Sequence, residues 1–228
     1  IHTHGGGGHD FMDGTPEAII KACMAHLAHG TTSICPTTLT CTDEELLTFF
    51  GCYREAGKQM ENGPELLGIH LEGPYFSLEQ RGAQDPQYIK VPAKDDYKKL
   101  LDASDDIIRM SAAPELEGAM ELADELKARG ILASIGHSDA TYAHVIEAWE
   151  RGYTHVTHLY SGMSTIRRIN AYRHLGVIES AYLIDGMTVE IIADGKHLPP
   201  ELLRFIVKMK PIEDICLVTD SMRGAGMD

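Results

Sequence analysis

Six side chains that could bind a metal ion or move a proton stand near the ends of short apolar runs. Four are histidines and two are carboxylates, in the order His2, His4, Glu72, His137, His158 and Asp220. Imidazole nitrogens and carboxylate oxygens are the usual ligands of catalytic metal ions in proteins. Because such an ion activates water for hydrolysis, these residue types indicate a metal-dependent hydrolase.

The spacing of the candidate ligands supports this chemistry to different degrees. His2 and His4 are two residues apart, so in a strand both side chains face the same way and can bind one ion. That pair alone also fits two incidental polar residues at a strand end. Glu72, His137 and His158 add ligands from three later segments, and the combination favours a metal site. One or two divalent ions are expected, and Zn, Fe, Mn and Co all suit these ligands.

Asp220 is the candidate catalytic residue. A carboxylate beside an activated water can take its proton and later return one to a leaving amine. The alternative role is the N-cap of a following helix, for which Ser221 competes. His197 could bind substrate or stabilise an oxyanion. His70 is expected to support the ligands, whereas His155 is expected on the opposite face of a regular strand.

Eight β-rich segments precede or contain these residues. They cover residues 1–4, 31–37, 66–73, 106–114, 131–138, 154–160, 188–194 and 215–220. Eight parallel strands that alternate with helices form a TIM-like (β/α)8 barrel of the α/β class, and functional side chains gather at the carboxyl ends of its strands. We therefore predict one metal-dependent hydrolase barrel over residues 1–228.

Helix signals lie between these segments. Thr15 before Pro16 predicts a capped helix that runs to Gly30, and Thr42 with Glu45 forms a capping-box pattern that opens the next helix, towards Met60. Further helices are predicted over residues 116–129, 140–151 and 199–208. Irregular loops are expected over residues 74–92 and 161–176, the second of them rich in arginine.

Composition narrows the partners and the compartment. The net charge of −14 argues against a surface for nucleic acid or anionic membranes, although a local cationic cluster could still bind a phosphorylated small molecule. Five cysteines without a C-x-x-C spacing favour a reduced, cytoplasmic protein. The chain begins with Ile1 and stops soon after a predicted strand, so we expect it to be a segment of a longer protein.

The chain resembles the N-acetylglucosamine-6-phosphate deacetylases, a family of the amidohydrolase superfamily. The matching motifs run from one end of the chain to the other and read HTHGGGGHDFMDGT, GIHLEGPY, RGAQ, APE, GHSDA, THLY, ADGKH and LVTDSMRGAGM. The resemblance implies hydrolysis of the acetamide of a 6-phosphorylated N-acetylhexosamine. It also implies a homodimer and a small terminal β-sandwich, which we do not expect within these residues.

The resemblance further implies residue roles. Glu72, His137 and His158 match the metal ligands of the family, His2 and His4 match the place of a further ion, and Asp220 matches the catalytic aspartate. The implied substrate contacts are Ala83, Ser161, Gly162, Arg173, Asp194 and His197. Among them, Arg173 is the predicted phosphate contact, because a guanidinium binds phosphate in a bidentate way.

Two departures leave the substrate open. The family reads Asn-Ala where this chain has Ser161-Gly162, and its R-x-P-G motif appears displaced, as Arg173 to Gly176. The fourth strand also has no lysine, which disfavours a site bridged by a carboxylated lysine, as in dihydroorotase and urease. The alternatives are an amidohydrolase that acts on another N-acyl amine and a catalytically silent barrel scaffold.

Overall fold

Six parallel strands form the main sheet of the computed structural model, which describes residues 1–227. Their order is β5–β6–β7–β8–β11–β12, so each strand pairs with the next strand of this sheet along the chain. Their bounds are β5 Ile69–Glu72, β6 Ile107–Ala112, β7 Leu132–Ile135, β8 Tyr153–Val156, β11 Thr188–Ile192 and β12 Ile215–Val218. Such sequential parallel pairing through helical crossovers is typical of a (β/α) barrel.

Two more segments extend the sheet beyond β5. Strand β3 (Ser33–Ile34) pairs in parallel with β4 (Glu65–Leu66), which lies just before β5 in the chain. Further on, Thr37 forms a parallel bridge with His70, and Thr3 forms one with Pro36. The N-terminal segment is therefore joined to the second segment, and the second to the third.

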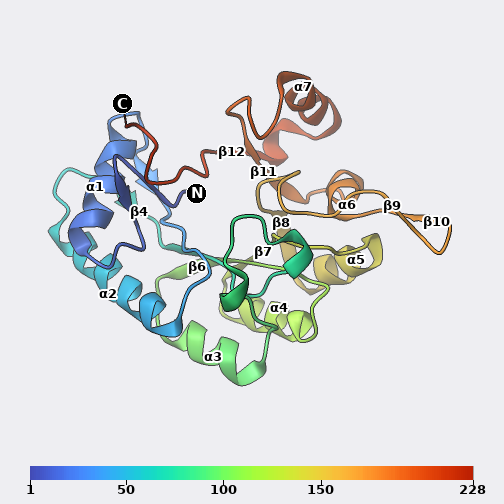
Figure 1. Ribbon diagram of the computed structural model, residues 1–228, viewed down its shortest axis with the longest axis horizontal. Helices are drawn as coiled ribbons and strands as arrows, with labels where there is room; N and C mark the ends of the chain where they lie inside the picture. Colours follow the sequence, from blue (N-terminus) through green and yellow to red (C-terminus); the bar gives the residue numbers. More distant parts are fainter. Residues whose placement is uncertain (228) are drawn as a thin grey trace.

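The remaining seam of the barrel closes between the N-terminal segment and the end of β12. Asp220 N donates to His2 O (3.1 Å), and His4 N donates to Ser221 O (2.9 Å). Figure 1 shows the N-terminus beside the chain that follows β12. All eight predicted segments thus take part in the barrel, which confirms the TIM-like fold. The first segment has only bridge pairing.

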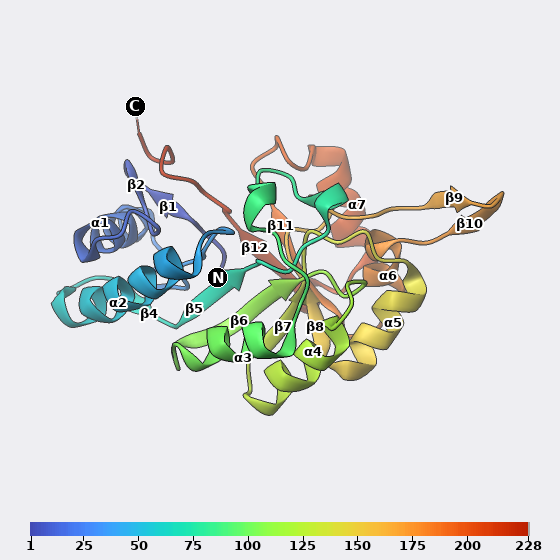
Figure 2. The same cartoon turned by 60° about the horizontal axis from the view of Figure 1, so that its bottom comes forward.

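Helices cover the outside of the barrel (Figures 1 and 2). Their bounds are α1 Pro16–Leu27, α2 Asp43–Gln59, α3 Lys94–Asp102, α4 Ala119–Ala128, α5 Tyr142–Arg151, α6 Val177–Leu183 and α7 Pro200–Met209. The predicted caps are present: the Thr15 side chain accepts from Ala18 N, and Thr42 with Glu45 forms a capping box. Within residues 1–227, no helix has the length and hydropathy needed to cross a membrane.

The two faces of the barrel wall differ in polarity. Apolar strand residues such as Leu71, Met110 and Ile135 belong to the hydrophobic core formed with the helices. Side chains that alternate with them point into the barrel and are polar. They are His70, Arg109, Ser111, Ser134, Thr157 and Glu190, and each is at most 5% exposed. The barrel interior is therefore a polar core that needs internal partners.

Several elements differ from the sequence-based expectations. Helices α3 and α6, of 9 and 7 residues, were not predicted, because neither begins with a side-chain cap. The arginine-rich segment predicted as an irregular loop instead contains an antiparallel hairpin, β9 (Arg167–Ile169) paired with β10 (Tyr172–His174). Figure 2 shows this hairpin projecting away from the barrel.

The other predicted loop contains the 3-10 turns Leu78–Gln80 and Pro86–Tyr88. A short antiparallel pair, β1 (Gly5–Gly6) with β2 (His9–Asp10), follows the first barrel segment.

Candidate metal centre

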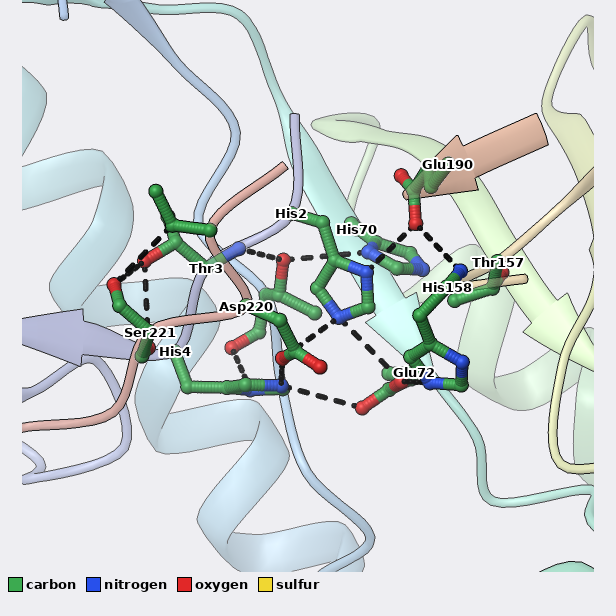
Figure 3. A network of polar contacts seen from close by, with 12 residues as sticks. His2, Thr3, His4, His70, Glu72, Thr157, His158, Glu190, Asp220 and Ser221 are labelled. Carbon is green, nitrogen blue, oxygen red and sulfur yellow. Dashed lines mark hydrogen bonds and ion pairs between the residues drawn. The ribbon is translucent and has the colours of Figure 1, made fainter. Parts of the chain in front are cut away.

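The six candidate residues meet at the carboxyl ends of the barrel strands. Glu72 is the last residue of β5, while His137, His158 and Asp220 each follow the end of a strand by two residues. His2 and His4 come from the N-terminal segment, which lies beside the end of β12. Figure 3 shows most of this cluster in one view. The distribution over five segments explains why no single stretch of sequence contains the site.

The backbone is strained at three of these positions. His137, His158 and Asp220 have φ values of 46°, 31° and 47°, a region that non-glycine residues rarely adopt. Each residue turns the chain at the point where its strand ends. Such strain costs of order 1–3 kcal/mol per residue and persists only where the surroundings enforce it. Its concentration on three candidate site residues supports a functional role for them.

Glu72 lies at the centre of the cluster. Its Oε1 is 3.3 Å from His137 Nε2, 3.0 Å from His158 Nε2 and 3.4 Å from His2 Nε2. Its Oε2 is 3.3 Å from His4 Nε2. Burial raises the pKa of Glu72, but the neighbouring histidines lower it by more, so the pKa lies well below its usual value. An ionised carboxylate with two differently facing oxygens could bridge two ions.

Asp220 completes a second group with His2 and His4. Its Oδ1 is 3.4 Å from His2 Nε2 and 3.1 Å from His4 Nε2. Potential ligand atoms of this group lie within 4.8 Å of one another, as do those of Glu72, His137 and His158. The Asp220 side chain is 18% exposed, against 2% for Glu72. Asp220 is therefore the carboxylate through which the cluster meets incoming molecules.

The hydrogen bonds of the histidines show whether the cluster fits a metal ion. Three Nδ1 atoms contact oxygens that can only accept: His2 with Glu190 Oε2 (2.9 Å), His4 with Thr37 O (3.3 Å) and His137 with Gln80 O (2.9 Å). In a neutral imidazole the proton is then on Nδ1, and Nε2 presents a lone pair to the cluster. His2 Nε2 is also buried without a hydrogen-bond partner among residues 1–227. Lone pairs and carboxylates that converge in this way fit a divalent cation.

His4 carries a proton when no cation is present. Burial lowers its pKa, but hydrogen bonds to Asp220 and Glu72 raise it more, to about 10. For Asp220, burial raises the pKa, and the contacts with His4 and His2 lower it below its usual value. A metal ion and this proton compete for the same Nε2 atom, so metal binding would release the proton.

Three supporting residues were missed by the sequence analysis. Gln84 is buried, donates from Nε2 to Glu72 Oε2 (2.8 Å) and accepts from Thr40 N at Oε1 (2.8 Å). Glu190 and Arg109 form a buried ion pair below the ligands. The signal for the pair was present in the sequence, because charged residues inside apolar strands must find partners. Gln84 carried no comparable signal.

Two histidines of the barrel interior are now located. His70 contacts Ser111 Oγ through Nε2 (2.7 Å) and stacks edge-on against His2 at 4.8 Å, in agreement with the expected supporting position. The expectation for His155 was wrong: it faces the interior, with Nε2 3.6 Å from Glu190 Oε1. The turned backbone at His158 breaks the regular alternation on which that expectation depended.

Three of the predicted substrate residues lie beside the cluster. A Cβ built on Gly82 would be 3.5 Å from His137 Cε1, and Gln84 contacts Glu72, so Ala83 between them is exposed next to the ligands. Ser161 N donates to His158 O (2.9 Å). Gly162 has φ +57°, and a Cβ there would be 2.9 Å from His137 Nδ1.

The other three predicted substrate residues are not brought into contact with the cluster within residues 1–227. Asp194 and His197 are exposed and paired with each other (Nδ1 to Oδ2, 2.9 Å). Hydrogen bonds from His197 and from the backbone lower the pKa of Asp194 to about 2. Arg173 is exposed on β10, opposite Arg168 in the projecting hairpin.

The amidohydrolase family model matches residues 1–225. The chain therefore belongs to the amidohydrolase family, which confirms the resemblance drawn from its motifs. Family membership agrees with the barrel and with the ligand types at its carboxyl end.

Several relatives are deacetylases of amino-sugar phosphates. The chain is 36% identical to an N-acetylglucosamine-6-phosphate deacetylase of Bacillus subtilis (strain 168), over 100% of this chain and 57% of the relative. It is 31% identical to an N-acetylgalactosamine-6-phosphate deacetylase of Escherichia coli O157:H7, over 99% of this chain and 59% of that protein. A mutant N-acetyl-D-glucosamine-6-phosphate deacetylase of Mycobacterium smegmatis, solved with N-acetyl-D-glucosamine-6-phosphate, matches with a TM-score of 0.91 and 32% identity, over 100% of this chain and 58% of that one. The chain thus spans less than two thirds of these relatives.

Proposed function

We propose that the protein removes the acetyl group of N-acetylglucosamine 6-phosphate, giving glucosamine 6-phosphate and acetate. The observation that carries the proposal is the arrangement of Asp220, the most exposed carboxylate of the cluster, within 3.4 Å of Nε2 of both His2 and His4. Deacetylases of N-acetylated hexosamine 6-phosphates are among the similar proteins. Amide hydrolysis is the reaction that these groups suit best.

One or two divalent ions, chosen among Zn, Fe, Mn and Co, are proposed as cofactors. Glu72, His137 and His158 would hold one ion, and His2, His4 and Asp220 would complete that site or hold a second. When bound, such an ion lowers the pKa of water from 15.7 towards roughly 7 and polarises a carbonyl group. The Nδ1 hydrogen bonds of His2, His4 and His137 would keep their Nε2 atoms directed at the site before an ion binds.

Asp220 is the proposed general base and acid. Its lowered pKa keeps the carboxylate ionised near neutral pH, so Oδ1 or Oδ2 can accept a proton from the attacking water. The new C–O bond forms at the acetyl carbonyl carbon. Asp220 then returns the proton to the sugar nitrogen, and the C–N bond breaks to release acetate and the amine. Ala83, Ser161 and Gly162 would surround the acetamide, and Asp194 would hold His197 for contact with the substrate.

Phosphate recognition and assembly are further parts of the proposal. Arg173 on the projecting hairpin is the proposed phosphate contact in a homodimer, since β10 extends away from the barrel that carries it. A cationic hairpin would bring a dianion to a protein of net charge −14. We also propose a cytoplasmic location, which agrees with five free cysteines.

A direct test measures acetate release from N-acetylglucosamine 6-phosphate by the full-length protein, with each candidate metal. Parallel reactions with N-acetylgalactosamine 6-phosphate and with unphosphorylated N-acetylglucosamine define the substrate. The alternative of another N-acyl amine is favoured by the Ser161-Gly162 pair, and a higher kcat/KM for an unphosphorylated amide would support it. Absence of metal-dependent acetate release from every amide would support the silent scaffold.

A further inference from the structure

Glu190 is the most deeply placed carboxylate of the barrel interior, and the proposed mechanism gives it no role. It lies on β11 with 0% of its surface exposed. A buried carboxylate is costly unless it is paired, and Arg109 on β6 pairs with Glu190 Oε1. The carboxylate is therefore ionised and can only accept hydrogen bonds.

The other oxygen of Glu190 contacts both groups of metal ligands. Oε2 accepts from His2 Nδ1 (2.9 Å) and from the backbone N of His158 (3.2 Å). Figure 3 shows His2 between Glu190 on one side and Glu72 with Asp220 on the other. Oε2 thus orients His2, which belongs to the group with His4 and Asp220. It also holds the turn at His158, which belongs to the group with Glu72 and His137.

Arg109 is also firmly held. It donates from Nη2 to Thr157 Oγ1 (3.0 Å) and to Ser134 Oγ (3.4 Å). Thr157 directly precedes His158 in the chain, so this network reaches the same turn from its other side. Arg109 and Glu190 come from β6 and β11, on different parts of the barrel wall. The barrel interior therefore determines the position of Glu190 before any ion or substrate arrives.

We infer that Glu190, anchored by Arg109, is a positioning residue that keeps His2 in the Nδ1–H tautomer and links the two groups of metal ligands. The inference rests on the proposed metal site and deepens it. A carboxylate behind a histidine ligand fixes its tautomer and ring orientation, and loss of such a partner typically weakens metal affinity about 10–100-fold. His2 would otherwise be free to place its proton on Nε2, where it would oppose a cation.

The first test uses the metal-free parent protein. Long-range proton–nitrogen NMR distinguishes the two tautomers of each histidine, and His2→Asn identifies the His2 signals by their loss. We expect the Nδ1–H tautomer for His2. An Nε2–H tautomer would overturn the inference while leaving the proposed function intact. A parent protein that binds no divalent metal in dialysis would instead overturn the metal site and this inference together.

The second test separates charge from hydrogen-bond acceptance. Arg109→Met is combined with Glu190→Gln, which keeps an acceptor, or with Glu190→Leu, which removes it; both double variants avoid an unpaired buried arginine. We expect metal affinity close to that of the parent for the glutamine variant and about 10–100-fold weaker affinity for the leucine variant, measured by competition with a chelator.

A matched control is Glu179→Leu. Glu179 caps α6 by accepting from Gly176 N (2.9 Å) and from Thr165 Oγ1 (2.7 Å), and it contacts none of the six candidate residues. The Glu179→Leu substitution should lower the melting temperature without changing metal affinity. Parent-like metal affinity in a folded Arg109→Met/Glu190→Leu double variant would show that Glu190 serves stability alone. If this double variant fails to fold, the tautomer of His2 in the parent protein still tests the inference.

Discussion

The cluster of candidate metal ligands and the loops around it are held by the chain in different ways. His2, Glu72 and His158 are at most 3% exposed, and each has contacts from several strands. Arg173 and His197 are exposed, and within residues 1–227 they have no hydrogen bond or ion pair with the cluster. The proposed metal site is therefore prepared by the barrel itself.

The difference has a physical basis. A buried ligand pays its desolvation cost during folding, so the barrel must supply its partners in advance. An exposed arginine stays solvated until the substrate, or a partner chain, displaces the water. We therefore expect substitutions in the cluster to abolish chemistry and substitutions in the outer loops to change substrate affinity.

The largest expected effect is that of metal removal. Dialysis against a chelator should remove nearly all turnover, because the ion is the proposed activator of the water beside Asp220. It should also lower the melting temperature, since a ligand that binds only the folded state stabilises it. Acetate release and metal content before and after metal is restored check this. Full turnover by metal-free protein would contradict the proposed role of the cluster.

Asp220→Asn tests the exposed edge of the cluster. An amide keeps the shape of the carboxylate but cannot accept the proton, so kcat should fall by about 10²–10⁴-fold. Metal content should remain nearly unchanged, because Glu72, His137 and His158 still provide three ligands. Steady-state kinetics and elemental analysis of one preparation provide both values. Activity within tenfold of the parent would remove Asp220 from the mechanism.

Gly162→Ala tests how closely the loops approach the cluster. At φ +57° an alanine is strained, and its Cβ would lie 2.9 Å from His137 Nδ1, so we expect about 10–100-fold weaker metal affinity. The matched control is Gly130→Ala, which has φ +71° and nothing within 4 Å of the added Cβ. Both variants should lose about 1–2 kcal/mol in free energy of unfolding. Equal metal affinities of the Gly162→Ala and Gly130→Ala variants would show that His137 binds metal equally well beside the added methyl group.

The smallest effect is expected at the hairpin. Arg173→Ala should raise KM for the phosphorylated sugar by about tenfold, the value of one charge-assisted hydrogen bond, with kcat and metal content unchanged. The unphosphorylated sugar should be affected little. Arg168→Ala, opposite in the hairpin register, is the control. Equal effects of both variants would indicate the general charge of the hairpin instead of a specific contact.

Much of the fold followed from local sequence patterns. The caps at Thr15 and Thr42 depend on side chains within three residues, so their helices could be predicted directly. Helices α3 and α6 lacked such signals: the N-cap residues of both, Ala93 and Gly176, make no side-chain cap hydrogen bond. The hairpin was missed because Asn170 and Ala171 turn the chain with positive φ in a segment without strand alternation.

The candidate ligands could be read from the sequence because their residue types and their places after apolar runs are local properties. Their distances, the Nδ1 partners that direct each Nε2 inward, and the roles of Gln84 and Glu190 could not. Gln84 and Glu72 are 12 positions apart, and Glu190 and His2 are 188 apart. The loop after β5 folds Gln84 back onto Glu72, and closure of the barrel brings Glu190 to His2. A hydrogen bond requires contact within about 3 Å, and local sequence patterns carry no information on such tertiary contacts.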